Sequence, residues 1–584
     1  MRARLAGALC AVLLVVTGTT AAGVTGDGRL RFALTLAPSA ARQAGRSAVD
    51  GRAYVIVSRK GAPEPRDQID ITGGVPFWGR NADGVRPGRP IVLDGGGGTY
   101  GYPLKSLASL PAGHYSVQAF FNTYDTFRRG DGSTVKMHMP CGDGMDLFHS
   151  PGNFSSTPRW IDVDPRHPRT VGLTLDRLIT PSQPVPPGGT CQQGNPADSA
   201  HVKHVKIQSP ALSKFWGRPI FIGANILLPA GYDPNGTVRY PVEYHFGHFT
   251  TNAPRGFRED GGNAFSKWWL SDAAPRFIVV EIREENPFYD TSYAVDTPNL
   301  GPYGQATTRE LIPAIDARFH TIAAPYGRLT SGGSTGGWMA LASQIFYPDV
   351  YGGAFAGYPD PVDLRREQIV NVYDDANAYD TIREWDRTPR PDSRTVPGDT
   401  NYVNAQENLW ELARGDRDRS GGSWAMWEAL YSRRGKDGYP AQAWDKRTGA
   451  IDHSVSAGWK AMDLSAKVAA EWPALGPKLQ GRVFLYVGDT DTYFLNTAVE
   501  LFQQRTDALT NPPSGFTFVY GRAKPHGWSP YTAQEWFQIY ADYVAKHAPK
   551  GVDASAWRGP RVTPRLNVSG GEIVPAEKHV GLPR

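Results

Sequence analysis

The sequence predicts an α/β fold: a mostly parallel sheet covered by helices on both faces, interrupted by a helical insertion and preceded by a β-rich domain. Two observations lead to this prediction. From about residue 204, short apolar runs typical of buried strands alternate with segments of helical periodicity. Before that point, β-branched runs are separated by glycine-rich turns, as in all-β domains.

The length and charge of the chain limit the number of domains and the kinds of partner to expect. At 584 residues the chain is too long for one ordinary core, so two or three domains are expected. A hydrophobic content of 40% and an aromatic content of 11% are typical of a globular protein. The 62 basic and 57 acidic residues nearly balance, which gives no reason to expect nucleic acid as a partner.

The first residues have the pattern of an export signal. Arg2 and Arg4 precede an apolar run at 5–16, and small residues follow at 20–22. A retained membrane anchor is the alternative, but the run is short for a membrane span. We expect a cleaved signal peptide at 1–22 and a secreted protein without a transmembrane segment.

Two cysteines, Cys141 and Cys191, remain after such a cleavage. A pair of cysteines in an exported protein indicates one disulfide bond. A nucleophilic cysteine is the alternative, but no histidine-bearing motif surrounds either residue. We favour a structural bridge.

Residues 29–178 are predicted to form a β-sandwich-like domain. The segment 52–58 is rich in β-branched residues, and 113–121 partly alternates polar and apolar residues at the period of a half-buried strand. A proline-, glycine- and serine-rich stretch at 181–200 predicts an interdomain linker, to which a Cys141–Cys191 bridge would be tied.

The α/β domain is predicted at 204–549. Its expected strands are 219–228, 240–246, 276–282, 328–331, 353–356, 482–487 and 516–520. Its expected helices are 307–319, 338–346, 495–505 and 532–548.

The alternation stops at 361–479, a polar segment that is rich in tryptophan. An insertion at this point leaves the sheet at the edge where α/β proteins bind ligands, so we expect it to cap the site. Alternatively, its aromatic residues only form a small core of their own. Residues 550–584 carry few apolar residues and predict a C-terminal tail.

The candidate nucleophile is Ser334. The sequence Gly332-Gly333-Ser334-Thr335-Gly336 fits G-x-S-x-G, a sharp strand-to-helix turn with a serine at its apex. Glycines are needed there because a Cβ on either side would clash. The predicted strand before the motif and helix after it are the context that the motif requires. An ordinary glycine-rich turn is the alternative.

A serine nucleophile needs a base, and the base needs an orienting carboxylate. The strand at 482–487 is followed by Asp489 and Asp491; we expect Asp491 to be the acid, with Asp489 in reserve, and one of them to cap the next helix. His526 lies in the loop after the last strand and is the expected base, although a lone loop histidine is often only solvated. Serine, aspartate and histidine follow in the order known for this chemistry.

Two backbone amides should face the negative charge that develops on the substrate. Thr335 should supply one, and Phe249, in the loop after the strand at 240–246, the other. His245 and His248 suggest a metal pair, but no carboxylate or cysteine ligand spacing accompanies them. We expect no metal and no cofactor.

Four further motifs accompany the nucleophile motif: Tyr240-Pro241-Val242, Glu310 to Asp316, Tyr326-Gly327-Arg328 and Tyr347-Pro348-Asp349. Together these motifs resemble the putative-esterase group of the α/β-hydrolases, which includes enterochelin-esterase-like and S-formylglutathione-hydrolase-like enzymes and mycolyltransferases. The chain departs from that group in one place, where glycine precedes histidine at Gly247-His248.

The resemblance implies an α/β-hydrolase catalytic domain and an exported serine esterase that acts on a small-molecule, carbohydrate or lipid ester. Acyl transfer to a sugar or lipid hydroxyl is a close alternative. A non-catalytic binding protein on a hydrolase scaffold is a second class, which the intact Ser334, Asp491 and His526 disfavour.

Overall fold

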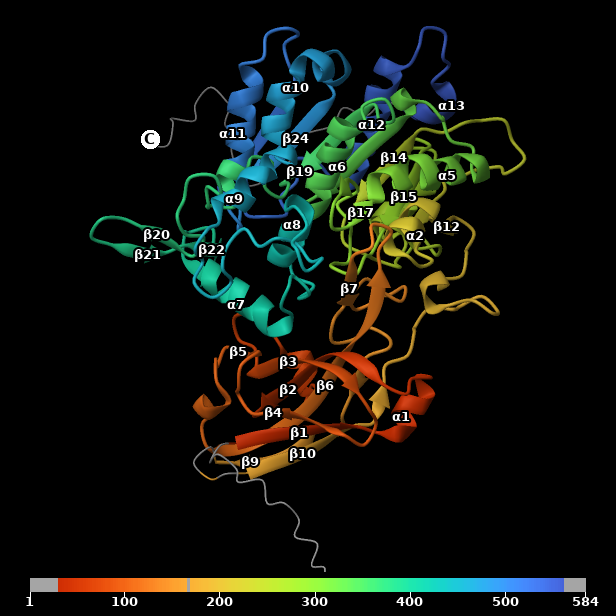
Figure 1. Cartoon of the computed structure of the whole chain (residues 1–584). Helices are drawn as coiled ribbons and strands as arrows, with labels where there is room; N and C mark the ends of the chain where they lie inside the picture. Colours follow the sequence, from red (N-terminus) through yellow and green to blue (C-terminus); the bar gives the residue numbers. More distant parts are fainter. Residues whose placement is uncertain (1–29, 165–166, 168, 561–584) are drawn as a thin grey trace, which may run out of the picture.

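The computed structural model describes residues 30–164, 167 and 169–560 (Figure 1). The predicted signal peptide at 1–22 and residues 561–584 of the predicted tail lie outside the described residues. Within the described ranges, no helix is long and apolar enough to cross a membrane.

An eight-stranded sheet forms the centre of the α/β domain. Two pairings at one edge, β12 with β13 and β13 with β15, are antiparallel, and the other five are parallel, which confirms a mostly parallel sheet. The strand order is β12 (Val202–Gln208), β13 (Phe221–Leu227), β15 (Ile278–Arg283), β14 (Val242–Phe246), β18 (Arg328–Gly333), β19 (Gly353–Gly357), β24 (Val483–Gly488) and β25 (Thr517–Gly521).

Helices cover both faces of this sheet. Thr330 and Ser331 are neighbours on β18, so their side chains point to opposite faces. Thr330 Oγ1 donates to the carbonyl of Ala340 in α6 (Thr335–Phe346) at 2.9 Å, whereas Ser331 meets the hydroxyl of Tyr540 in α12 (Ala533–His547).

The face with α6 also carries α10 (Leu464–Leu479) and α11 (Leu495–Asp507), and α10 packs against both. The predicted insertion at 361–479 therefore ends in a helix that belongs to the helical layer. The remaining elements of the domain are α2 (Pro210–Trp216), α3 (Ala264–Trp269), β16 (Asp296–Thr297), β17 (Gly301–Pro302), α4 (Tyr303–Ala306), a π-helical turn (Thr307–Leu311), α5 (Ile312–Arg318) and α13 (Ser555–Arg558).

Two sheets form the N-terminal domain and share one core. Phe32, Leu34 and Leu173 from the smaller sheet meet Val55 and Val117 from the larger one. The smaller sheet has the order β10 (Arg169–Leu175), β1 (Leu30–Leu36) and β4 (Pro90–Leu93). The larger sheet has the order β11 (Arg177–Leu178), β8 (Phe154–Ser155), β6 (Gly113–Arg128), β2 (Val49–Ser58), β3 (Phe77–Val85) and β5 (Thr99–Tyr102). Strands β7 (Thr134–Met137) and β9 (Arg159–Val163) also pair with β6. Helix α1 (Pro38–Gln43) follows β1.

The long hairpin β6–β7 reaches out of the N-terminal domain into the α/β domain (Figure 1). Its residues Phe127, Val135 and Met137 are buried in the same core as the central sheet. Beside them, Arg129 donates to the carbonyls of Asn299 and Gly438 at 3.1 and 2.7 Å. The hairpin therefore fixes the two domains together through both apolar and polar contacts.

Cys141, just after β7, forms a disulfide bond with Cys191. The bond joins the predicted linker at 181–200 to the hairpin region. This is the bridge that the two cysteines predicted.

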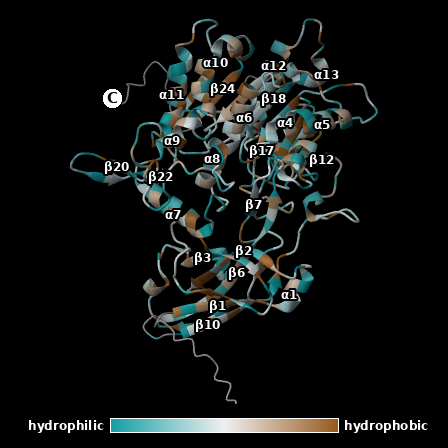
Figure 2. Cartoon of the chain, in the orientation of Figure 1, coloured by the Kyte–Doolittle hydropathy of each residue, from teal (hydrophilic) through white to brown (hydrophobic). Residues whose placement is uncertain are grey.

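The insertion contains β20 (Asp380–Ile382), β21 (Arg387–Pro389), β22 (Pro391–Arg394), β23 (Thr400–Val403), α7 (Asn404–Arg414), α8 (Ser423–Tyr431) and α9 (His453–Ser456). Most of its tryptophans form a buried core in which neighbouring rings meet edge to face: Trp424, Trp427, Trp444 and Trp459. Trp385, at the tip of the projecting β20–β21 hairpin, is 90% exposed. Figure 2 shows that this hairpin is mainly hydrophilic, whereas hydrophobic residues concentrate in the strands of both domains.

A buried arginine connects the N-terminal domain to the insertion. Arg52, on β2, is fully buried and donates to the carbonyls of Leu412 and Ala413 at the end of α7, both at 3.2 Å. Tyr54 donates to the carbonyl of Arg414. These bonds satisfy carbonyls that a helix end leaves without partners.

We predict that Arg52→Met lowers the Tm of the transition that unfolds the N-terminal domain by roughly 4–8 °C, because removing a charged donor costs about 2 kcal/mol and leaves buried carbonyls unpaired. Differential scanning calorimetry measures the shift. Arg80→Met is the matched control, since Arg80 lies on the next strand at the surface, where its ion pair with Asp94 contributes little. Equal shifts in the two variants would contradict the role given to Arg52.

Candidate active site

Ser334 lies at the turn between β18 and α6 with φ 59° and ψ −126°, a conformation that is strained for a residue with a side chain. Two glycines of the motif allow this turn. A Cβ on Gly332 would lie 2.3 Å from the carbonyl oxygen of Gly336, and one on Gly336 would lie 2.1 Å from that of Phe246. The motif is therefore the sharp turn that the sequence predicts, with the serine at its apex.

The structure brings the three predicted catalytic side chains together. His526 Nε2 lies 3.0 Å from Ser334 Oγ, and His526 Nδ1 lies 2.8 Å from Asp491 Oδ2. Asp491 is fully buried, and its other oxygen accepts the backbone amides of Tyr493 and Leu495 at 2.9 and 3.3 Å. These bonds hold the carboxylate in position against the imidazole.

The reserve residue, Asp489, has another partner. Its carboxylate accepts the amide of Ala523 at 2.7 Å, which ties the end of β24 to the loop that carries His526. Of the two aspartates, Asp491 alone contacts the imidazole in the described structure, and Asp489 shapes the loop beneath it.

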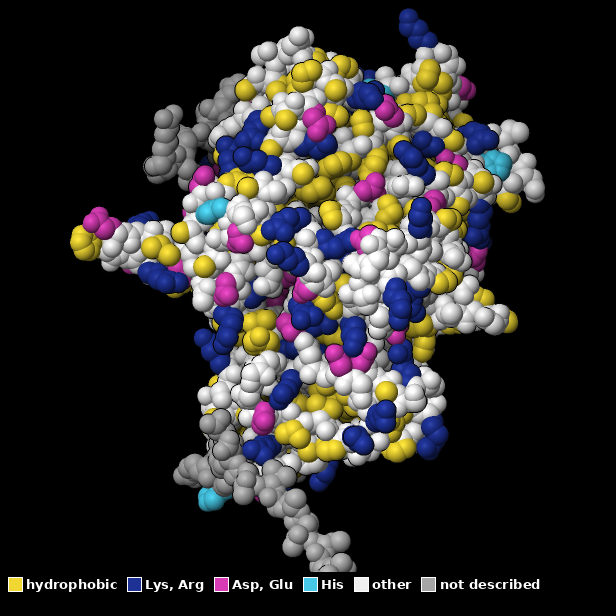
Figure 3. Space-filling model, viewed as in Figure 1, with side chains coloured by type: hydrophobic (Ala, Val, Ile, Leu, Met, Phe, Trp, Pro, Cys, Tyr) yellow, Lys and Arg dark blue, Asp and Glu magenta, His cyan; other side chains and the backbone are white. Residues whose placement is uncertain are grey.

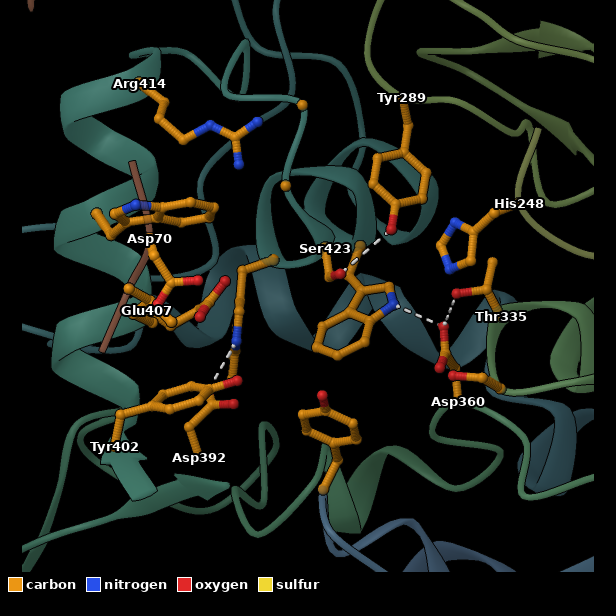
Figure 4. A pocket seen from close by; sticks show the side chains of 18 of the residues that line it. Asp70, His248, Tyr289, Thr335, Asp360, Asp392, Tyr402, Glu407, Arg414 and Ser423 are labelled. Atoms are coloured by element: carbon orange, nitrogen blue, oxygen red, sulfur yellow. Dashed lines mark hydrogen bonds between the residues drawn. The ribbon is translucent and has the colours of Figure 1, made fainter. Parts of the chain in front are cut away.

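Ser334 and His526 open onto a cavity of about 880 Å³ (Figure 4). Three parts of the chain line it. The α/β domain contributes Ser334, His526 and Tyr289, and the insertion contributes residues from α7 and α8 such as Trp427. The N-terminal domain contributes residues of two segments, 66–71 and 146–149. The insertion therefore lies over the site, and the N-terminal domain closes one side of it.

Of the two predicted oxyanion residues, Thr335 lines the cavity and Phe249 does not. Thr335 lines the cavity and begins α6, where helix geometry leaves its amide free for a ligand. Phe249 is not among the lining residues; its ring packs against Gly144, where an added Cβ would lie 2.5 Å away. His248 lines the cavity from the same loop, and Figure 4 shows its ring beside Thr335.

His248 pairs with Asp290 at 3.0 Å. This hydrogen bond raises the pKa of His248 above its ordinary value, against the opposing effect of burial. The protonated imidazole therefore persists to higher pH than in a free histidine, and when protonated it carries a positive charge beside Thr335 (Figure 4).

Asp360 is a site residue that the sequence analysis missed. Its carboxylate accepts hydrogen bonds from Thr335 Oγ1 at 3.0 Å and Trp427 Nε1 at 3.3 Å (Figure 4). It also accepts one from Tyr293 Oη at 2.6 Å. It thus connects the residue after the nucleophile to the insertion. Its position three residues after β19 was a usable signal, because parallel strands end at one edge of the sheet.

The described residues contain no group of histidine, cysteine, aspartate and glutamate side chains that could hold a metal ion. His245 lies beneath the site, where it bonds Ser331 at 2.9 Å, and burial lowers its pKa well below the ordinary value. His245 and His248 thus have separate partners.

The fold and the site define the class of protein: an esterase of the α/β-hydrolase type. A family model described as "Putative esterase" matches residues 220–522, more than half of the chain. The chain belongs to this family, which confirms the resemblance drawn from its motifs.

Among solved structures, the chain is similar to a ferulic acid esterase, at 17% identity over 59% of this chain and 97% of that chain, with a TM-score of 0.31. It is also similar to a fluorophosphonate-binding serine hydrolase of Staphylococcus aureus (11%, 59% and 98%, TM-score 0.32) and to an S-formylglutathione hydrolase from Agrobacterium tumefaciens (13%, 60% and 95%, TM-score 0.28). No curated protein sequence matches the chain.

We predict that Asp491→Asn lowers kcat by about 10⁴-fold, because an amide no longer fixes the imidazole tautomer that accepts the serine proton. Asp489→Asn is the matched control and should cost far less, since it changes only a loop contact. Steady-state hydrolysis of an activated ester measures both. A larger loss in Asp489→Asn would transfer the acid role to that residue.

Proposed function

We propose that this protein is an exported serine esterase that hydrolyses a carboxylic ester through a Ser334–His526–Asp491 triad and an acyl-enzyme. The observation that carries the proposal is the continuous hydrogen-bonded chain, with 3.0 Å between Ser334 Oγ and His526 Nε2 and 2.8 Å between His526 Nδ1 and Asp491 Oδ2. Both distances are within the reach required for general-base catalysis.

In acylation, Ser334 Oγ attacks the ester carbonyl while His526 Nε2 takes the hydroxyl proton. Asp491 holds Nδ1 protonated, so that Nε2 is the free base, and its charge stabilises the imidazolium that forms. His526 then gives the proton to the departing alcohol oxygen. Water, activated by the same imidazole, attacks the acyl-enzyme and releases the acid.

The negative charge on the tetrahedral intermediate faces the N-terminus of α6. The Thr335 amide and the helix dipole both favour an anion at this point. The second donor comes from the loop Gly247-His248-Phe249. The position of His248 on the cavity favours the start of this loop over Phe249, and its positive charge would add to the stabilisation.

Acyl transfer to an alcohol is the second candidate. It uses the same acyl-enzyme and requires only that an alcohol occupy the place of water. The observation that favours it is the size of the cavity, about 880 Å³, which has room for an acceptor beside the acyl group. Adding an acceptor sugar and measuring the ratio of transferred to hydrolysed product separates the two activities.

Export is part of the proposal. The basic and apolar start of the sequence and the Cys141–Cys191 disulfide support it, because such bonds persist in oxidising compartments. Sequencing the N-terminus of the protein recovered from culture medium tests it: the chain should begin after Ala22.

We predict that Ser334→Ala and His526→Ala each lower kcat for ester hydrolysis by about 10⁴–10⁶-fold, and that the double variant loses little more, because triad members act as one unit. His114→Ala is the control, since His114 lies on an exposed part of the N-terminal domain. Independent, additive losses would refute the triad.

A further inference from the structure

The cavity continues past the triad into a second region, which we call the distal compartment. Figure 4 shows it on the opposite side from His248, Thr335 and Asp360. The compartment is defined by one residue of the N-terminal domain and five of the insertion: Asp70, Asp392, Tyr402, Glu407, Trp410 and Arg414.

Tyr493 joins the distal compartment to the catalytic histidine. Its ring centre lies 5.0 Å from that of His526, edge to face. The pKa of Tyr493 is raised, chiefly by burial and then by the charges of Asp392 and Glu407, with Asp491 adding to them. The phenol is therefore within electrostatic reach of both the triad and the distal carboxyl groups.

The position of the distal compartment beside His526 indicates which part of an ester enters it. His526 must lie beside the alcohol oxygen, because it gives that oxygen a proton as the bond breaks. The oxyanion side is occupied by Thr335 and His248. The space beyond His526 and Tyr493 is therefore on the alcohol side of the scissile bond.

The lining has the chemistry of a site for hydroxyl groups. Trp410 and Tyr402 supply aromatic rings, and Arg414 lies over the Trp410 ring at 4.2 Å. Burial raises the pKa of Asp392 to about 7 and that of Glu407 well above its ordinary value, so near neutral pH these carboxyl groups can donate as well as accept hydrogen bonds.

One buried amide is incompletely satisfied. Gln368, 3% exposed, lines the cavity and donates to Asp392 at 3.3 Å. Its carbonyl oxygen is buried and has no hydrogen-bond partner within the described part of the chain. A buried acceptor without a partner is costly, so this oxygen adds polarity to the cavity wall without being offered to a ligand.

We propose that the distal compartment binds the alcohol part of the ester, that this part is an uncharged, hydroxyl-rich group of about the size of a sugar ring, and that the N-terminal domain takes part in this binding through Asp70. The inference rests on the proposed esterase function. A mixture of donors, acceptors, both signs of charge and aromatic faces suits such a group better than a fixed charge or an alkyl chain.

Three esters with one acyl group test it: the methyl ester, a sugar ester acylated on a primary hydroxyl, and the choline ester. The acyl group is that of the p-nitrophenyl ester which the wild type cleaves fastest. The expected result is a kcat/KM for the sugar ester at least tenfold above that for the methyl ester. Preference for choline would overturn the proposal in favour of a cation site.

Two variants from different domains extend the test. Asp70→Asn keeps the oxygen that accepts from Thr72 and replaces the other carboxylate oxygen, the acceptor offered to the ligand, with an NH2 donor. Glu407→Ala removes a carboxyl group from α7. Each should lower the sugar-to-methyl ratio of kcat/KM by up to about tenfold, the upper end of the value of one lost hydrogen bond. Asp162→Ala, an exposed carboxylate on β9 remote from the cavity, is the matched control and should leave the ratio unchanged.

The outcomes separate the two proposals. If the wild type cleaves none of the p-nitrophenyl esters, the esterase function itself fails. If it cleaves them, but shows no preference for the sugar ester and an unchanged ratio in Asp70→Asn and Glu407→Ala, only the distal compartment proposal is overturned. Circular dichroism and Tm measurements confirm that each variant is folded.

Discussion

The active site depends on one close approach between two backbones. Gly336, in the first turn of α6, lies against Phe246 and Gly247 at the end of β14, with no room for a side chain between them. This contact forces Ser334 into its strained turn and fixes the Thr335 amide relative to the loop that carries His248. Ser334, the proposed nucleophile, and the proposed oxyanion site are thus held by the backbone of the sheet and of α6.

Segments far apart in the sequence then enclose this edge of the sheet. The β6–β7 hairpin is buried in the α/β core, and Arg52 joins the N-terminal domain to the end of α7. An apolar cluster that includes Phe148 and Ala413 closes the same interface. Figure 3 shows charged side chains of both signs interspersed over the viewed face, across both domains. The N-terminal domain is therefore a fixed wall of the cavity.

The sequence predicted the site where chemistry follows local pattern. Ser334, Asp491 and His526 each follow a strand of a parallel sheet, and the ends of such strands meet at one edge. It says less where position depends on the path of a loop: Phe249 was expected to supply an oxyanion amide, and the residue of that loop that lines the cavity is His248. Helix α10 fell within the insertion predicted at 361–479, yet it packs against α6 and α11. Pro473 and Pro477 lie inside this helix, and proline is a poor helix former. No local signal marks Asp70, since only domain docking brings it to α7.

The most direct test of the central claim is the identity of the nucleophile. The purified protein is treated with a fluorophosphonate probe, digested and mapped by mass spectrometry. The account predicts one adduct, on the peptide that contains Ser334, and a much slower labelling rate in His526→Ala, because the hydroxyl then lacks its base. Labelling of a different residue, or no labelling of folded wild-type protein, would contradict it.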